Sequence, residues 1–353
     1  MIVEKSTGLE VRPAVDADAP RWDEYVRGHS LGTVFHLWGW GSATESAFGA
    51  IRQDLIALQS GEVVGVLPLS ACRRFYKPRT WISAPWGVYG DPLGDQALIT
   101  RALAEHAVER ARSGGVPRLE LRCRVDPGLD GFLSSDLYAT YSKELPATPE
   151  EVMSGYKKSE RRYIRQAEEV HGLRFEEGDQ HRPALEKLFL SSKRTLGSPG
   201  LSHAWWSALE EHLKDEYTIH AAIREETVVA ATLTFHGKGE ASLFYVGTTP
   251  EANREYSATK FMIAKCSEWA IREGNNSLDL GRSRQGTGAA AFKTHQGFEA
   301  NPHSYQYALL NDRASVPSFN PSNPKTELVR KVWSKMPLMA CELLTAQLGR
   351  FLA

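Results

Sequence analysis

Cysteine is scarce in this sequence, and the few cysteines are widely scattered. The 353 residues contain only four, and no two of them form a CxxC pair: Cys72, Cys123, Cys266 and Cys341. This spacing argues against a zinc cluster and favours a reducing compartment. The 11 histidines form no HxH or HExxH motif, so we expect no metal site.

Long apolar runs and a surplus of one charge are missing as well. No stretch approaches the ~20 uncharged apolar residues that a membrane-spanning helix needs, and we expect no secretory signal, because no basic segment precedes an apolar run at the N-terminus. Lysine and arginine number 42 against 43 aspartates and glutamates, a formal net charge of −1. Any contact with nucleic acid or an anionic membrane must therefore be a local patch. Length and composition predict a cytoplasmic globular protein of about two domains.

An order-preserving repeat is present. Residues 54–69 and 217–234 each read as a strand–turn–strand hairpin with a Val-Val pair just after the turn. Each hairpin continues into an aromatic-rich strand, a helix and a short strand, with the helices at about 96–112 and 257–272 and the short strands at 118–121 and 277–280. The hairpins lie 165 positions apart (63 to 228) and the short strands 159 apart (119 to 278). This pattern predicts a duplicated α/β domain rather than a solenoid, whose periods run to ~50 residues.

A helix is expected to open the second domain. Thr148 and Glu151 form a capping box with Pro149 at the first helical position, and Gly172 is placed to end the helix. The expected apolar face combines Val152, Tyr156, Tyr163, Ala167 and Val170. We therefore expect a first domain over 1–147, a second domain with the main site over 148–312, and a linker with an amphipathic helical tail over 313–353.

The tail has two interpretations. It carries five basic residues, Lys325, Arg330, Lys331, Lys335 and Arg350, against Glu327 and Glu342. It is either a terminal helix docked on the second domain or a segment that touches an anionic membrane peripherally, at its inner face.

The order hairpin, strand, helix, strand in each half is the layout of the GNAT acyltransferase fold. Residues 278–288, LDLGRSRQGTG, followed by 291–298, AFKTHQGF, resemble the signature of Fem-type aminoacyltransferases. Those are tandem-GNAT enzymes that build peptidoglycan interpeptide bridges from aminoacyl-tRNA. The basic helix at 157–165 and the aromatic–glycine loop at 84–92 also resemble that family, and the tail resembles that of a subgroup encoded with exosortase and exopolysaccharide systems.

The resemblance implies a reaction centre at Lys293, whose ammonium would stabilise the negative charge on the attacked ester carbonyl. The plainer alternative is a surface lysine on a short helix. Arg282 and Ser283 are donors at the strand end where this fold opens its cleft. Further substrate contacts are expected from five residues: Tyr245, Arg194, Trp86, Tyr89 and Asp91. For the three aromatic residues the alternative is a role in the core. Asp91 or the acceptor's own phosphate would take the proton from the attacking amine.

The helix after Thr148 carries four cations opposite its apolar face: Lys158, Arg161, Arg162 and Arg165. They fit the phosphates of tRNA or of a lipid-pyrophosphate acceptor, and the alternative is a solvated helix face.

The expected acyl donor is not coenzyme A. An ordinary GNAT enzyme holds the coenzyme A pyrophosphate on a glycine-rich turn, R-x-x-G-x-G or A, at a helix N-terminus. Here Ser257 and Thr259 replace the small turn residues after Arg254. The window after Trp40 also lacks the lysine by which Fem enzymes contact a nucleotide-linked muropeptide.

These observations favour an enzyme that forms an amide on an amine of a lipid- or nucleotide-linked envelope precursor, with aminoacyl-tRNA as donor and without a cofactor or DNA. Two alternatives remain. One is an N-acyltransferase that uses acyl-CoA or an acyl carrier protein on an amino sugar of an exported polysaccharide. The other is a non-catalytic binder of a lipid-linked glycan.

Overall fold

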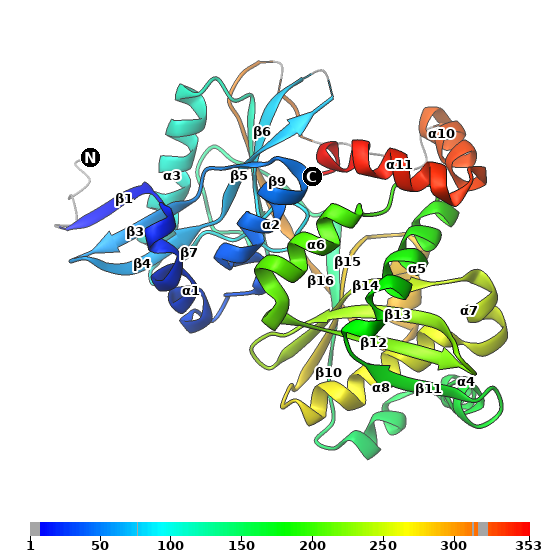
Figure 1. Cartoon of the computed structure of the whole chain (residues 1–353). Helices are drawn as coiled ribbons and strands as arrows, with labels where there is room; N and C mark the ends of the chain where they lie inside the picture. The colour runs from blue at the N-terminus through cyan, green and yellow to red at the C-terminus, as the bar shows by residue number, and fades with distance from the viewer. Residues whose placement is uncertain (1–7, 76, 313, 317–323) are drawn as a thin grey trace.

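The computed structural model describes residues 8–75, 77–312, 314–316 and 324–353. Two α/β halves lie side by side, and a helical tail runs along one edge of the pair (Figure 1). The expected linker around Pro317 to Pro324 lies almost entirely outside the described residues. Within the part of the chain that is described, no helix is both long and apolar enough to cross a bilayer.

The first half contains two sheets. Its hairpin, β3 (Leu55–Gln59) and β4 (Glu62–Leu67), lies in a four-stranded sheet of order β1-β3-β4-β7, and the second sheet has the order β2-β5-β6-β8-β17-β9. The remaining strands of this half are β1 (Leu9–Pro13), β2 (Ile51–Arg52), β5 (Leu69–Arg74), β6 (Lys77–Ser83), β7 (Leu93–Gly94), β8 (Arg118–Cys123) and β9 (Leu133–Ser135). Helices α1 (Ala19–Gly28), α2 (Trp38–Phe48) and α3 (Ala97–Ser113) complete it.

The second half is built on one seven-stranded sheet of order β11-β12-β13-β14-β15-β10-β16. Its own strands are β11 (Leu173–Glu177), β12 (Tyr217–Arg224), β13 (Thr227–Phe235), β14 (Glu240–Thr248), β15 (Ser277–Arg284) and β16 (Glu299–Pro302). The helices are α4 (Lys158–Glu169), α5 (Arg182–Thr195), α6 (His203–Leu213), α7 (Pro250–Tyr256), α8 (Ala258–Arg272) and α9 (Gly288–His295).

The two hairpins match in detail. Each has a register shift at the same place, between Ala57 and Leu58 in the first and between Ala222 and Ile223 in the second. Because a bulge is a specific local irregularity, its recurrence at the same offset supports the predicted duplication. The copies differ after Pro68, where the equivalent of β13 divides into β4 and β5. Proline has no N–H to donate to a sheet ladder, which accounts for a break at this position.

Each half also contributes one strand to the other. Strand β10 (Tyr138–Glu144) pairs with β15 and β16 in the second-half sheet, and β17 (Ser304–Leu309) pairs with β8 and β9 in the first. Strand pairing therefore crosses the boundary expected at residue 148, and the division into 1–147, 148–312 and 313–353 stays a prediction.

The prediction of one continuous helix from Thr148 to Gly172 is wrong. A 3₁₀ helix over Pro149–Gly155 and helix α4 are separated at Tyr156, whose backbone is extended. Tyr156 is buried, and the Lys143 ammonium lies 4.4 Å from its ring, so tertiary packing decides the break. Tyr163 and Val170, expected on the apolar face, are 45% and 70% exposed. Gly172 has a φ of +65°, as the expected helix end requires.

The tail consists of α10 (Pro324–Lys335), α11 (Leu338–Leu348) and a 3₁₀ turn over Gly349–Phe351. Its buried Trp333 and Cys341 form a small core with Leu190 of α5. The end of the tail reaches the first half, where Phe351 stacks on Phe75 with ring centroids 4.0 Å apart. The tail thus bridges both halves (Figure 1).

Candidate functional site

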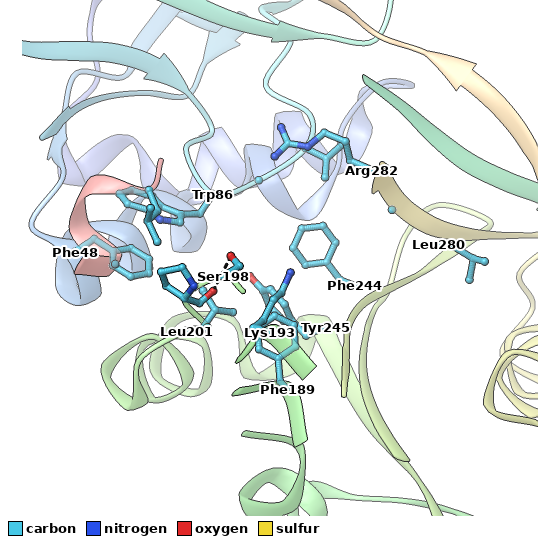
Figure 2. Close-up of a pocket in the computed structure, with 17 residues that line it drawn as sticks. Phe48, Trp86, Phe189, Lys193, Ser198, Leu201, Phe244, Tyr245, Leu280 and Arg282 are labelled. Carbon is cyan, nitrogen blue, oxygen red and sulfur yellow. Dashed lines mark hydrogen bonds between the residues drawn. The ribbon is translucent and has the colours of Figure 1, made fainter. Parts of the chain in front are cut away.

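The central strands of the second half part from each other and open a cavity. Strands β14 and β15 pair in parallel only from Glu240 to Ser242 against Ser277 to Asp279. Beyond this point a cavity of about 530 Å³ is lined by residues of both strands, of α5, of the first half and of the tail. Figure 2 shows Trp86 of the first half, Lys193 of α5 and Phe244 of β14 around one space. The site is therefore assembled from both halves.

The cavity lining contains two cations and, among the described residues, no carboxylate. The Lys193 ammonium of α5 points into the cavity (Figure 2), 5.1 Å from the centre of the Phe189 ring. Burial lowers the pKa of Lys193, and the nearby Arg282 lowers it further. Arg282 donates a hydrogen bond to the Tyr305 hydroxyl (2.8 Å), and its guanidinium lies 4.7 Å from the Tyr138 ring. This pair of cations is suited to a phosphate or another anionic group.

Lys193 was missed by the sequence analysis, which selected its neighbour Arg194. The Arg194 guanidinium instead donates to the backbone carbonyl of Met336 (3.2 Å) and so helps to hold the tail. It does not line the cavity. Adjacent helical residues point about 100° apart, so only one of the two can face the site. The local sequence Lys193-Arg194-Thr195 gives no signal that tells which of the two faces the site.

Two expected aromatic contacts do line the cavity. The Tyr245 hydroxyl accepts a hydrogen bond from Trp205 Nε1 (2.9 Å), and burial raises the Tyr245 pKa. Its own hydrogen therefore remains available for a ligand acceptor. Trp86 stacks on Phe48 with ring centroids 4.1 Å apart and has a φ of +61°, which is an unusual conformation for a bulky residue.

Lys293 lies directly behind the cavity wall. Gly281, which lines the cavity, has a φ of +70° and forms a bulge in β15 opposite Tyr141 of β10. The Lys293 ammonium donates to the Gly281 carbonyl (2.8 Å), and the Gly281 N–H donates to Asp279 Oδ1 (2.8 Å). Burial lowers the pKa of Lys293 to about 8, with Lys193 and Arg282 adding to the shift and Asp279 opposing it. Lys293, Arg282 and Lys193 are thus electrostatically coupled.

Three other expected contacts lie away from this cavity. Ser283 is buried and pairs with Ala139 of β10. The Asp91 carboxylate accepts hydrogen bonds from the Arg124 backbone N–H (2.7 Å) and from Arg124 Nε (3.2 Å), and Asp91 is not part of the lining. A proton-accepting role for Asp91 at this cavity is therefore not supported. Tyr89 donates to Thr140 Oγ1 (2.9 Å).

Tyr89 lines a second cavity of about 250 Å³ between the two halves, together with Glu240 and Asp279. Burial raises the pKa of Glu240 to about 7 and that of Asp279 to about 6, and in Glu240 the nearby Asp279 adds to the shift. Asp279 therefore lies between this cavity and the Gly281 wall of the larger one.

The basic face of α4 is exposed through Lys158, Arg162 and Arg165, whereas Arg161 donates to the Tyr156 carbonyl (3.0 Å). Glu160, the acid within this cluster, is buried. It binds Lys260 of α8 (2.9 Å) and accepts a hydrogen bond from Gln296 Nε2 (2.6 Å). Because Glu160 points inward, it does not neutralise the basic face, and it joins α4 to α8 and to the segment that follows α9.

The start of α8 lacks the open turn of a coenzyme A site. Ser257 has a φ of +53°, and Asn253 Oδ1 accepts the hydrogen bond of the Thr259 N–H (3.0 Å). This backbone donor is therefore engaged within the chain, where a pyrophosphate cradle needs free N–H groups.

The equivalent gap of the first half is filled. Strands β6 and β8 pair in parallel only at Trp81 and Ile82. Between them the buried Arg122 donates to Glu120 Oε1 (3.0 Å) and to the Gly87 carbonyl (3.0 Å). The larger cavity therefore lies at the strand parting of the second half, although residues of both halves line it.

Comparison with known proteins agrees with this architecture. Residues 154–294 match the family described as acetyltransferase (GNAT) domain. The structure of FemX is similar over 91% of this chain and 100% of that chain, with a TM-score of 0.68 and 14% identity. L-PGS from Bacillus licheniformis (92% of this chain and 99% of that chain, TM-score 0.52, 14% identity) is also similar. So is the C-terminal domain of a putative lysylphosphatidylglycerol synthetase from Agrobacterium fabrum (83% and 91%, TM-score 0.54, 15% identity).

A sequence comparison with curated proteins gives no match. The family match supports an acyltransferase, and the structural likenesses show the fold. The predicted α/β class with two tandem GNAT-like domains is confirmed, as is the resemblance to Fem-like and GNAT acyltransferases at the level of the fold. The exosortase-associated subgroup stays a prediction.

Proposed function

We propose that this acyltransferase moves an aminoacyl group from aminoacyl-tRNA to an amine of a phosphate-bearing cell-envelope precursor. The observation that carries the proposal is the cavity at the parting of β14 and β15, which has two cations and no carboxylate in its described lining and Lys293 behind its wall. An anionic substrate is stabilised by these side chains without a competing acid. The similar structures include FemX and the C-terminal domain of a putative lysylphosphatidylglycerol synthetase. Phosphatidylglycerol, in the name of the second protein, is a phosphate-bearing lipid.

The proposed reaction forms one amide and breaks one ester. The amine nitrogen of the acceptor attacks the ester carbonyl, the C–N bond forms, and the C–O bond to the tRNA ribose breaks. The ribose oxygen takes the proton that the nitrogen loses, carried by the acceptor's own phosphate, because the Asp91 carboxylate is engaged with Arg124. The positive charge of the Lys293 ammonium, behind the Gly281 wall, stabilises the oxyanion of the tetrahedral intermediate.

The donor would bind on the basic face of α4. Lys158, Arg162 and Arg165 are exposed there, and exposed cations along a helix are typical contacts for the phosphates of RNA. Glu160 connects α4 with the Gln296 side chain, three residues after Lys293. The tRNA acceptor end would therefore approach the site from this side, and the enzyme would work at the inner face of the membrane, where such a precursor is held.

The proposal is tested by transfer of a radiolabelled amino acid. Protein is incubated with tRNA charged with labelled amino acids and with a lipid extract of bacterial envelopes, and label in the organic phase is counted with and without ribonuclease. We expect ribonuclease-sensitive transfer. Lys193→Met should raise the KM for the acceptor about tenfold, the loss expected for a charged hydrogen bond, whereas Lys187→Met, an exposed lysine of the same helix, should not. Binding of the extract without any transfer would instead support a glycan binder.

A second candidate is an N-acyltransferase that uses acyl-CoA or an acyl carrier protein on an amino sugar. The observation in its favour is the match of residues 154–294 to an acetyltransferase (GNAT) domain. Acyl-CoA is disfavoured as the donor, because the Thr259 N–H is already hydrogen-bonded to Asn253 Oδ1. Transfer from labelled acetyl-CoA that survives ribonuclease would favour this candidate.

A further inference from the structure

The tail hairpin, which we define as residues 324–353, exposes an unusual amount of apolar surface. Six large apolar side chains of α10 and α11 are between 41% and 73% exposed: Leu328, Val329, Val332, Met339, Leu343 and Leu344. Packing on α5 is provided by other side chains, Trp333 and Cys341, which are buried. The exposed set is therefore not needed for docking the hairpin on its own domain. An exposed apolar patch of this kind marks an interaction surface.

The charges of the hairpin are mainly positive. Lys331 and Lys335 are exposed on α10, and the sequence of the hairpin contains five basic residues against Glu327 and Glu342. Lys331 forms an ion pair with Glu327 at 2.7 Å. Apolar side chains bordered by lysine and arginine are typical of helices that lie in the interface of an anionic membrane.

The hairpin also forms part of the larger cavity. Gly349 and Leu352, at its end, line the cavity beside Phe48 and Trp86. Leu352 is 46% exposed, so it lies where the cavity wall meets the molecular surface. The end of the hairpin thus forms part of the wall of the cation-lined cavity.

We propose that the tail hairpin docks this protein on an anionic phospholipid membrane and so places the cavity next to a membrane-held acceptor. The placement of the acceptor rests on the proposed function, whereas the docking does not. A phospholipid surface fits better than a second copy of the chain, because lysine is depleted in protein–protein interfaces and borders the apolar side chains here. An anionic membrane suits both the apolar side chains and the lysines of the hairpin. The acyl chains of the lipids would contact the apolar side chains, and the anionic headgroups would bind the lysines.

Docking is tested by vesicle flotation of the full chain without any acyl donor. One set of vesicles is phosphatidylcholine alone. The other contains phosphatidylcholine and about equal parts of phosphatidylglycerol, a lipid with a single negative charge. We expect flotation with the mixed vesicles that weakens at high salt. Met339→Glu combined with Leu343→Glu should weaken partitioning at least about tenfold, since two apolar contacts are replaced by like charges. The matched control is Leu98→Glu on α3, whose leucine is 50% exposed in the first half.

Several outcomes would overturn the proposal. One is a wild-type protein that stays at the bottom of the gradient with both kinds of vesicle, and another is equal flotation of the double variant. A third is a concentration-dependent dimer in light scattering that the double variant abolishes, because the hairpin would then be an interface between copies. Thermal denaturation checks that the variants fold. Since no donor is present, these results are independent of whether tRNA is the acyl source.

Discussion

At the scale of single residues, burial and neighbouring charges set the protonation of Lys293, for which we propose a catalytic role. Its ammonium is held by the Gly281 carbonyl at 2.8 Å, directly behind the wall of the cavity. Burial, together with the nearby Lys193 and Arg282, lowers its pKa to about 8, and Asp279 acts in the opposite direction. The group therefore remains mainly charged at neutral pH and loses its proton in mildly alkaline solution.

We predict that Lys293→Met lowers kcat about a hundredfold or more, the usual loss when one oxyanion donor is removed. The KM for the acceptor should change little, because the ester oxygen is nearly neutral before the attack. In this mechanism Lys293 is active in its charged form. The wild-type rate should therefore fall as the pH rises through about 8, the pKa of Lys293. This decline should be absent in the Lys293→Met variant. The measurement is the steady-state transfer rate between about pH 6 and pH 10, a range that brackets the pKa of Lys293.

A binding role for Lys293 would give a different result. In that case Lys293→Met would raise the KM and leave the turnover rate unchanged. The exposed Lys187 of α5 provides the control, since Lys187→Met removes a lysine charge without touching the cavity.

At the scale of single elements, α4 exposes Lys158, Arg162 and Arg165, whereas its buried acid, Glu160, is engaged with Lys260 and Gln296. We predict that Arg162→Ala combined with Arg165→Ala weakens tRNA binding and reduces the slope of log K against log salt by about 1 for each phosphate that the protein no longer neutralises. Filter binding of tRNA at a series of salt concentrations measures this slope.

The matched control for α4 is the pair Arg101→Ala and Arg112→Ala on α3, two exposed arginines of the other half. It should leave the slope unchanged. If the α3 pair flattens the slope and the α4 pair does not, tRNA binds elsewhere. Arg161 is a poor choice for this experiment, because its hydrogen bond to the Tyr156 carbonyl supports the start of α4.

The beginning of α8 leads to a prediction about coenzyme A. Because Asn253 Oδ1 already accepts the Thr259 N–H, the pyrophosphate would have to displace this hydrogen bond before it could bind. Acetyl-CoA should therefore bind no better than about millimolar, an affinity of roughly −4 kcal/mol. Isothermal titration calorimetry checks this, and micromolar affinity would favour the acyl-CoA candidate.

At the scale of the whole molecule, the exchange of β10 and β17 makes the two sheets depend on each other. Strand β10 lies between β15 and β16, and β17 lies between β8 and β9. Cutting the chain at residue 148 would leave β10 without either partner and would remove β17 from the first-half sheet. Unpaired strand edges are sites of aggregation.

We predict that residues 1–147 and 148–353 do not fold when produced separately, and that the full chain unfolds in one calorimetric transition. Coexpression of both pieces should restore soluble protein, because all strand partners are then present. A stable, cooperatively unfolding fragment of either half, or two separate transitions in the full chain, would contradict this interdependence.

Much of the fold follows from local sequence. The β3–β4 and β12–β13 hairpins, the helices α3 and α8 and the duplication itself were predicted, because strand alternation, turn residues and helix periodicity are encoded within short windows. The motif around Lys293 and the replacement of the turn glycines by Ser257 and Thr259 were also visible in the sequence.

Other features were decided only by the tertiary structure. Strands β10 and β17 are short, and the strand beside which each one lies depends on residues more than a hundred positions away. Lys193 rather than Arg194 faces the cavity, because the tail occupies the other side of α5. The break at Tyr156 follows from the burial of its ring. Local chemistry selects the elements, whereas long-range packing selects their partners and the side chains that reach the site.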